Sequence, residues 1–467
     1  MRRVAFALML FAPLLAGCID LAPAYKRPAV SVPVAVANGA GEVQTAPRVA
    51  AWRDFFGDKR LAQVIELGLA RNQDLPAAVA NVQIARAQWL SQRSQLFPSL
   101  NGQASASGSD TPASVLGIPG TTGSFTQRIY AAELAIPSYE VDLFGRVRSL
   151  TRQARQQYFA SRAARDTAQI SLVSQIAQAW LTLGSDRALL AIARDTLQET
   201  SKQLALTQAK LDHGEAALSD VDRARGLVGQ ARFDVGRYAT QVAQDRDALE
   251  LLVGAPVEDA LLPGGVADAA AVMGELPTGV ASSVLLARPD VVQAEDQLKG
   301  ANANIGAARA AFFPQITLTG SGGLTSTALS SLFHASSGAW SYAADLTQPI
   351  FDAGKNRAGL MQAKAQRDLA QANYEKAIQT AFREVADALA QRARIDEELA
   401  AQETSVAADA DAVRLIQAQY RAGTASELDV LTAQASLYAA QEALTTTQLL
   451  KATNLVALYQ ALGGGIS

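Results

Sequence analysis

Apolar side chains recur at helical spacing across residues 355–420. They step by three or four positions, which is the period of one buried helix face. The clearest set is Tyr374, Ile378, Phe382, Val385 and Leu389. Residues 350–467 also contain no proline, and proline is the residue that breaks helix interiors. The pattern predicts a helix about 100 Å long, at about 1.5 Å per residue.

A glycine-containing turn at residues 422–426 separates this helix from a second one. Gly423 suits the left-handed conformation in which helices end, and the Ser426 side chain can cap the helix that follows. Leucines at a looser helical spacing continue beyond the turn. We therefore expect a long helical hairpin over about 355–462, with Gly423 at its tip.

The same hairpin occurs earlier in the chain. Residues 138–255 are also free of proline, and both proline-free stretches are 118 residues long. Turn residues recur in register, each pair 209 residues apart: Gly145 and Gly354, Gly214 and Gly423, Asp220 and Asp429, Gly254 and Gly463. Such matches indicate an internal repeat. We assign a first repeat to residues 61–275, with its hairpin at about 146–254, and a second to 276–467.

Alternating polar and apolar residues predict two strands in each repeat. They are expected at about 98–107 and 125–137, where the second strand ends at Pro137, and at about 314–322 and 339–349. These lengths are close to the 9–11 residues or so of a transmembrane β-strand. Trp340 and Tyr342 would suit an aromatic belt at the membrane interface. The alternative is a small soluble hairpin beside the helices.

Four strands cannot close a membrane barrel within one chain. Bacterial barrels begin at about eight strands, and an open sheet edge is not tolerated in lipid. A barrel of about eight strands is filled by its own side chains, whereas the polar positions here are mostly small. The sequence therefore favours a barrel shared by three or more chains.

Leucines at heptad spacing mark one seam in the first hairpin. Leu190, Leu197, Leu204 and Leu211 form the seam, with Ala193, Thr200 and Thr207 beside it. A narrow seam of this kind is typical of coiled-coil packing. Several hairpins could stand side by side as the wall of a tube, and the alternative is a water-soluble coiled-coil rod.

The amino terminus has the pattern of a secretory signal peptide over residues 1–17. Leu15-Ala16-Gly17-Cys18 resembles the bacterial lipobox, so Cys18 is expected to be lipidated and residues 18–60 to form a tether. The alternative is an ordinary signal peptide with an incidental cysteine. Cys18 is the only cysteine, which excludes an intramolecular disulfide. Residues 52–71 and 75–96 are expected to form two helices.

Composition gives no support for catalysis. The net charge is −3, so a nucleic-acid-binding surface is not indicated. The two histidines, His213 and His334, lie far apart in the sequence. No metal-ligand cluster, Ser/His/Asp set or phosphate-binding loop stands out. We therefore expect no enzyme activity, no cofactor and no metal site.

Four motifs carry a family resemblance that covers nearly the whole mature chain. They begin at Tyr139 (YEVDLFGR), Ala287 (ARPDV), Leu346 (LTQPIFDAG) and Tyr420 (YRAGTASELDVL). The sequence resembles outer-membrane efflux channels of the TolC family, in the lipoprotein branch that includes OprM and NodT. The fold class that this resemblance implies is mainly α with a β-barrel part. The resemblance also implies a homotrimer in the outer membrane of a Gram-negative bacterium, with a twelve-stranded barrel and a large periplasmic α-helical barrel.

The resemblance also implies the partners and the function. The tapered tip of the tube would open onto a periplasmic adaptor (membrane fusion) protein and an inner-membrane pump of the resistance-nodulation-division type. The channel would passively conduct small molecules and drugs, with outer-membrane lipid around it. A type I protein secretion channel is one alternative. A non-channel coiled-coil scaffold of the envelope is the other.

The expected gate lies at the hairpin tips, whose turns are formed by Gly214 and Gly423. Asp220 and Asp429 follow these glycines by six residues, so we expect them one to two turns into the returning helices. In the family the matching aspartates line the narrow periplasmic end, and the tyrosine that matches Tyr420 helps to hold the tip closed. The alternative is that both aspartates are solvated charges at helix starts.

This sequence departs from the family pattern at two positions near the tip. Thr432 replaces a frequent aspartate, and Ala425 replaces an arginine that locks the tip in some members. A different closing network is therefore expected, with Arg421 or Glu427 as candidates.

Overall fold

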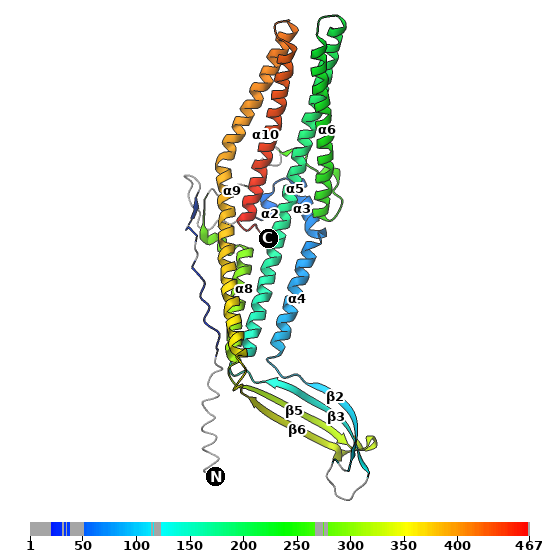
Figure 1. The fold of residues 1–467 in the computed structure, drawn as a ribbon, viewed down its shortest axis with the longest axis vertical. Coiled ribbons are helices and arrows are strands. Elements are labelled where there is room, and N and C mark those ends of the chain that lie inside the picture. The colour runs from blue at the N-terminus through cyan, green and yellow to red at the C-terminus, as the bar shows by residue number, and fades with distance from the viewer. Residues whose placement is uncertain are drawn as a thin grey trace. The chain divides into compact units, whose positions relative to one another are not determined.

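The computed structural model describes residues 20–29, 32–33, 35–37, 51–113, 115, 123–266, 274 and 279–465. The expected signal peptide and Cys18 lie outside these residues. Two long helical hairpins and one four-stranded sheet make up most of the described chain (Figure 1). The mainly α fold predicted from the sequence is confirmed.

The two hairpins have the same dimensions. In the first, α5 (Arg146–Asp212) is followed by α6 (Leu218–Val253), and in the second α9 (Lys355–Arg421) is followed by α10 (Glu427–Ala461). The outgoing helices contain 67 residues each, and the returning helices contain 36 and 35. Each loop between them is five residues long.

The glycines that recur in the repeat all adopt left-handed backbone conformations. Their φ angles are +74° and +87° at Gly145 and Gly354, +76° and +77° at Gly214 and Gly423, and +75° and +91° at Gly254 and Gly463. A β-carbon is unfavourable in this conformation. The backbone therefore requires glycine at both members of each pair, which explains the 209-residue register.

Shorter elements precede the first hairpin or lie between the two hairpins. The helices are α2 (Trp52–Phe55), α3 (Lys59–Arg71), α4 (Asp74–Ser94) and α8 (Pro289–Ala310), with 3₁₀ turns η2 (Asp259–Leu261), η3 (Ser282–Ala287), η4 (Leu329–Ser331) and η5 (Ala335–Ser337). Strands β1 (Ala35–Ala37) and β4 (Gly279–Ala281) form a small antiparallel pair. The expectation of a single helix over residues 52–71 is wrong, because the helix is interrupted at Gly57. Asp58 then caps α3 by accepting hydrogen bonds from the Arg60 and Leu61 amides.

The larger sheet contains β2 (Asn101–Pro112), β3 (Ser124–Glu140), β5 (Gln315–Ser326) and β6 (Gly338–Thr347), in that order and all antiparallel. The prediction that the second strand ends at Pro137 is wrong, because β3 continues to Glu140. The register with β5 shifts between Ile136 and Tyr139. Proline cannot donate to the ladder, and a bulge lets the strand pass it.

The strand register sorts side chains onto one apolar and one polar face. Leu134 pairs with Gly322, which pairs with Trp340, and Tyr342 pairs with Gly320. On the opposite face, Gln103 pairs with Glu133. All ten residues of β6 are exposed, so this strand covers no core within one chain. The apolar face must therefore be covered by something other than this chain.

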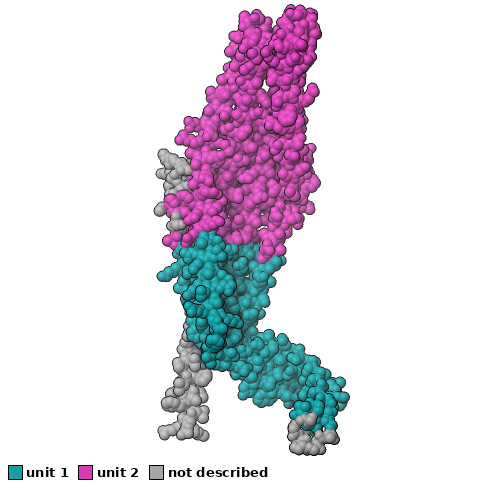
Figure 2. Space-filling view, viewed as in Figure 1, with its two compact units in different colours: residues 1–28, 82–161, 294–374 teal, residues 29–81, 162–293, 375–467 magenta. Residues whose placement is uncertain are grey.

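The described chain forms two compact units (Figure 2). Unit 1 contains residues 1–28, 82–161 and 294–374, and unit 2 contains residues 29–81, 162–293 and 375–467. Each unit draws on both repeats, so the repeats interleave. Among the described helices, none is both long enough and apolar enough to cross a membrane.

The hydrophobic core of unit 2 is built around aromatic side chains. Phe55 stacks on Tyr459 with ring centroids 4.7 Å apart, and Phe56 meets Phe55 edge-on. The Trp180 indole is fully buried and donates a hydrogen bond of 2.9 Å to the Leu261 carbonyl. These contacts join α2 and the end of α10, and tie α5 to η2.

In unit 1, the tether at residues 20–28 is bound along the helices by polar contacts. Arg27 makes two 2.8 Å hydrogen bonds to the buried Glu295 carboxylate on α8. The Asn302 amide donates to the Pro23 carbonyl at 2.7 Å, and Arg152 pairs with Asp20. The hydrogen bonds from Arg152 lower the pKa of the Asp20 carboxyl to about 2, against the opposing effect of its partial burial.

In the structure, the continuous buried seam lies three positions after Leu190, Leu197 and Leu204, although Leu190 is buried as well. Ala193, Thr200 and Thr207 are buried, whereas Leu197 and Leu204 are half-buried. Small side chains allow helices to approach closely. The threonine hydroxyls also find hydrogen-bond acceptors within their own helix. Thr200, for example, donates to the Thr196 carbonyl at 2.8 Å.

Candidate functional site

Both hairpin tips, which lie in unit 2, close with the same backbone hydrogen bonds. At the first tip, the Glu215 amide donates to the Lys210 carbonyl at 2.8 Å. At the second, the Thr424 amide donates to the Gln419 carbonyl at 2.9 Å. These bonds span five residues around a left-handed glycine, which is the Schellman arrangement for ending a helix. The turn glycines predicted from the sequence thus lie in the two tips. Figure 1 shows these tips as the loops between α5 and α6 and between α9 and α10.

Asp429 caps the helix that follows the second tip. Its carboxylate accepts hydrogen bonds from the Ser426 amide at 2.8 Å and the Ser426 hydroxyl at 2.6 Å. In return, the Asp429 amide donates to the Ser426 hydroxyl oxygen at 3.2 Å. This is a capping box in which Ser426 is the N-cap residue and Asp429 is the acidic residue three positions later. The Ser426 hydroxyl and amide hold the pKa of the Asp429 carboxyl below its usual range.

Asp220 occupies the equivalent position at the first tip with a weaker cap. Its carboxylate accepts from the Ala217 amide at 3.3 Å and pairs with Arg223 at 3.1 Å. Ala217 has no side-chain acceptor, so only half of the box forms. Both aspartates are the third residue of their helices. The expectation that they lie one to two turns into the helix is therefore wrong, because they belong to the first turn.

A buried carboxylate at the second tip joins the two hairpins. Glu427 is 7% exposed and accepts hydrogen bonds from Thr207 on α5 and from the Tyr420 hydroxyl at 3.2 Å. The Gln203 amide on α5 donates to it at 3.4 Å. The Lys210 ammonium lies 3.9 Å from the centre of the Tyr420 ring, a cation–π contact. Helices α5, α9 and α10 are thus held together by one acceptor.

The structure brings together some of the predicted gate residues and leaves others apart. Tyr420 bonds to Glu427 rather than to either aspartate. Arg421 donates to the Gln417 carbonyl on its own helix. Thr432 likewise donates to the Leu428 carbonyl. Of the two candidates for a substitute closing network, the contacts within one chain favour Glu427.

Sequence reasoning missed three side chains of this network: Gln203, Thr207 and Lys210. Thr207 was identified only as a packing position beside the leucine seam. One signal was available, since a threonine in a buried seam carries a hydroxyl that can donate to a neighbouring helix. Gln203 and Lys210 carried no sequence signal that separates them from solvated helix residues.

A second carboxylate links the hairpins further from the tips. Glu442 on α10 accepts a 2.5 Å hydrogen bond from the Tyr238 hydroxyl on α6 and lies 3.6 Å from Arg237. Arg237 also pairs with the buried Asp234 at 3.2 Å. Burial raises the pKa of the Tyr238 hydroxyl, as does the Glu442 carboxylate. Tyr238 therefore remains a donor at physiological pH.

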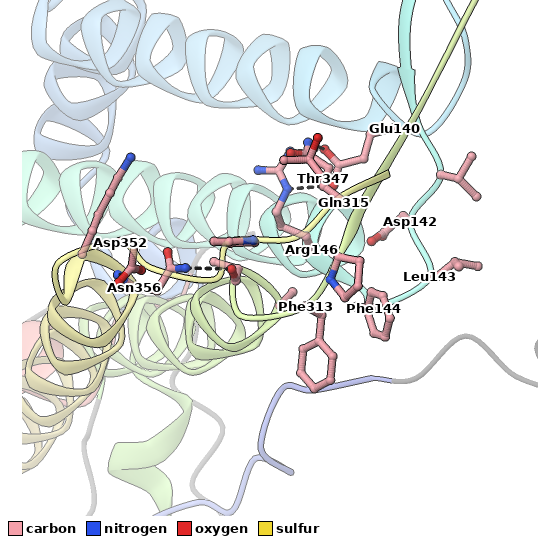
Figure 3. A pocket seen from close by; sticks show the side chains of 16 residues that line it. Glu140, Asp142, Leu143, Phe144, Arg146, Phe313, Gln315, Thr347, Asp352 and Asn356 are labelled. Atoms are coloured by element: carbon pink, nitrogen blue, oxygen red, sulfur yellow. Dashed lines mark hydrogen bonds and ion pairs between the residues drawn. The ribbon is translucent and has the colours of Figure 1, made fainter. Parts of the chain in front are cut away.

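In unit 1, the motifs that begin at Tyr139 and Leu346 form the junction between strands and helices (Figure 3). They line a pocket of about 370 Å³. Arg146 pairs with Glu140, and the Phe144 and Phe313 rings stack with centroids 4.7 Å apart. Asp352 caps α9 by accepting from the Asn356 amide at 2.9 Å. These contacts stabilise the junction between the strands and the helices. No group of three or more potential metal-ligating side chains occurs in the part of the chain that the structure describes.

We expect the local stability of the α10 start to fall on acidification. The pKa of Asp429 is lower when folded than in an unfolded chain, so its contribution is complete above the unfolded pKa. It is lost as the pH falls through the folded pKa. Hydrogen-exchange protection of the amides at 426–429 should decrease below about pH 4. Asp429→Asn should remove this dependence, and Asp409→Asn on α9 should retain it. An unchanged profile in Asp429→Asn would contradict the capping role.

Comparison with known proteins gives one consistent result. The model of the family described as "Outer membrane efflux protein" matches residues 64–255 and 280–464. The chain is 41% identical over 470 residues to the probable efflux pump outer membrane protein TtgC of Pseudomonas putida, covering 100% of this chain and 96% of TtgC. It is 37% identical over 460 residues to the cation efflux system protein CusC of Escherichia coli, covering 97% of both.

Solved structures agree with this similarity. The open state of the MtrE outer membrane channel of Neisseria gonorrhoeae superposes with a TM-score of 0.83 and 36% identity. The match covers 96% of this chain and 98% of MtrE. The likeness therefore extends over both hairpins and the sheet.

Proposed function

Since the chain belongs to the outer membrane efflux protein family, we propose that it is the outer-membrane channel of a tripartite efflux system. One observation carries the proposal. The four-stranded sheet has an apolar face, a polar face and two edge strands, β2 and β6, that pair with no further strand among the described residues. Three copies would supply twelve strands, which close a barrel with an apolar outer face and a polar lumen.

The remaining parts of the system follow from the same premise. A periplasmic adaptor would meet the helical hairpins, and an inner-membrane pump of the resistance-nodulation-division type would supply the energy. The channel itself conducts passively and catalyses no reaction. The names of its relatives refer to different cargoes, including cations for CusC. The proposed cargo is therefore the broad class of small molecules that the pump exports.

The assembly is tested by its stoichiometry and its conductance. Native mass spectrometry of the protein in detergent should show three chains, and planar bilayers should show single-channel currents. A stable, conducting monomer would refute the shared barrel. A trimer without current would favour the coiled-coil scaffold. Translocation of a polypeptide in cells that contain a type I pump would favour the secretion alternative.

We also propose that Asp220 and Asp429 form two rings of three carboxylates around the narrow end of the trimer. The proposal is supported by the equivalent positions of the two aspartates in the first turns of α6 and α10, beside each tip. Rings of carboxylates favour cations. The double variant Asp220→Ala/Asp429→Ala should lower cation selectivity in bilayers and weaken block by multivalent cations added on the periplasmic side. Asp411→Ala, an exposed carboxylate paired with Arg414 on α9, is the matched control. Unchanged selectivity and block would mean that both aspartates only cap helices.

The lipid anchor is a separate part of the proposal. Cys18 follows a lipobox-like sequence and is the only cysteine. Mass spectrometry of the mature amino terminus should show a diacylated or triacylated cysteine. Cys18→Ser should remove the acyl groups but leave the trimer in the membrane, because the barrel holds it there. An unmodified terminus at another residue would contradict the anchor.

A further inference from the structure

A basic cavity lies in unit 1 between the tether, α8 and α9. Its volume is about 440 Å³. Four cationic side chains line it: Lys26, Arg309, Lys364 and Arg367. No carboxylate is present among the described residues that line it, and the buried side chains of Leu298 and Ile305 form an apolar part of its wall. Four cations around one cavity whose lining holds no carboxylate indicate a site for an anion.

The charges of this cavity are only partly satisfied within the chain. Lys26 and Lys364 are exposed and take part in no ion pair among the described residues. Arg367 pairs with Asp368 at 3.0 Å through Nη2, but its Nε is buried and has no hydrogen-bond partner. An unpaired buried donor costs free energy. An oxygen-rich anion in the cavity would satisfy Arg367 and neutralise the two lysines.

The nearby carboxylate Glu295 cannot fill this role. Arg27 holds it through two hydrogen bonds, Tyr25 donates to it at 3.1 Å, and Lys299 lies 3.6 Å away. These contacts together hold the pKa of Glu295 below its usual range despite its burial. The carboxylate is therefore fully engaged with the tether. The ligand for the cavity must come from outside the described chain.

The position of the cavity in the sequence favours a lipid. Arg309 is six residues before β5, and Lys364 is nine residues into α9, which is about 14 Å of helix. The cavity thus lies beside α8 and α9, within about three helical turns of the end of the sheet that would leave the membrane. Pro23, on its rim, is five residues from Cys18, within about 17 Å of extended chain. A lipid anchor at Cys18 would keep this rim close to the membrane surface.

We propose that the cavity binds the phosphate group of an anionic phospholipid in the periplasmic leaflet of the outer membrane. The inference rests on the proposed function, because it requires the sheet to span that membrane. Lysine and arginine bind phosphate oxygens through charge-assisted hydrogen bonds. Basic pockets beside membrane-spanning segments recognise anionic headgroups in the same way. The acyl chains would lie in the hydrocarbon beside the barrel, which free phosphate cannot do.

The test measures phosphatidylglycerol binding to the full-length trimer by native mass spectrometry, with phosphatidylcholine as the neutral comparison. Phosphatidylglycerol should bind more tightly, with up to three sites per trimer. The double variant Lys26→Ala/Lys364→Ala should lower the affinity for phosphatidylglycerol about thirtyfold, because it removes two cations that attract the headgroup. Neither lysine makes an ion pair in the described structure, so folding should be preserved. Lys376→Ala, an exposed lysine twelve residues further along α9, should bind like the wild type.

Four results would overturn the inference. The first is equal affinity for both lipids. The second is equal loss of binding in the double variant and in Lys376→Ala. The third is displacement of phosphatidylglycerol by millimolar inorganic phosphate, which would assign the cavity to the free anion. Carbodiimide cross-linking of Lys364 to a carboxylate of a neighbouring protomer would also contradict a lipid occupant. Single-channel currents test the proposed function separately, so a conducting trimer without lipid preference would refute only this inference.

Discussion

Arg288→Ala is expected to lower the free energy of unfolding by about 3 kcal/mol. Arg288 is 7% exposed and lies just before α8, in unit 2. Its Nη1 donates to the Ala461 carbonyl at 2.6 Å, and its Nη2 contacts Asp290 at 2.7 Å and Glu384 at 2.8 Å. Removal of the guanidinium leaves a buried carbonyl without its donor and two carboxylates without their counter-charge. The effect stays at the low end of the range for buried pairs because both carboxylates are partly exposed.

Two further variants make this prediction specific. Arg288→Lys should recover only part of the loss, because one ammonium cannot reproduce the planar geometry that serves three acceptors. Arg394→Ala removes a surface arginine whose partner Glu397 is also exposed, and should change stability by less than about 1 kcal/mol. Guanidinium denaturation followed by circular dichroism gives the comparison. Equal stability of Arg288→Ala and Arg394→Ala would show that the Arg288 contacts contribute nothing.

Glu427→Ala is expected to shift the closed–open equilibrium of the channel toward the open state by about a hundredfold. Three side chains lose their shared acceptor at once: Thr207, Gln203 and Tyr420. Hydrogen bonds to a charged acceptor contribute about 1.5–3 kcal/mol each, and part of this is recovered when water enters. The net loss of about 2.7 kcal/mol corresponds to the stated factor. Open probability in planar bilayers is the measurement.

The same site offers graded controls. Glu427→Gln keeps an acceptor oxygen without the charge and should have a smaller effect. Thr207→Val removes one donor at nearly constant volume and should give an intermediate shift. Glu442→Ala breaks the link to Tyr238 and separates a tip-specific effect from general loosening of the hairpins. Wild-type open probability in Glu427→Ala would rule out a closing role for this carboxylate.

The features that could be predicted from sequence are those fixed by local conformation. Proline-free stretches and helical spacing identified both hairpins, and Gly214 and Gly423 marked the tips because their backbone conformation excludes other residues. The alternating strands were also recognisable. Pro137 was misleading, because a bulge carries β3 past a residue that normally ends pairing.

The contacts between hairpins could not be predicted in this way. Glu427 and Thr207 are 220 residues apart in sequence, and an acidic first residue of a helix is fully explained by the helix dipole. Only packing against α5 makes Glu427 a buried acceptor. Likewise, nothing in the sequence distinguishes Leu197 from the better-buried Thr200. The difference depends on which face the neighbouring helices cover.

The uncovered sheet has a consequence for the order of folding. Unit 2 has its own core around Trp180 and Tyr459, so it can reach its native packing in a newly exported single chain. The sheet cannot, because Trp340 and Tyr342 remain about three-quarters exposed there and its two edge strands stay unpaired among the described residues. We therefore expect biogenesis of the channel to proceed in two stages. The second stage requires contacts between chains, so its rate should rise with protein concentration.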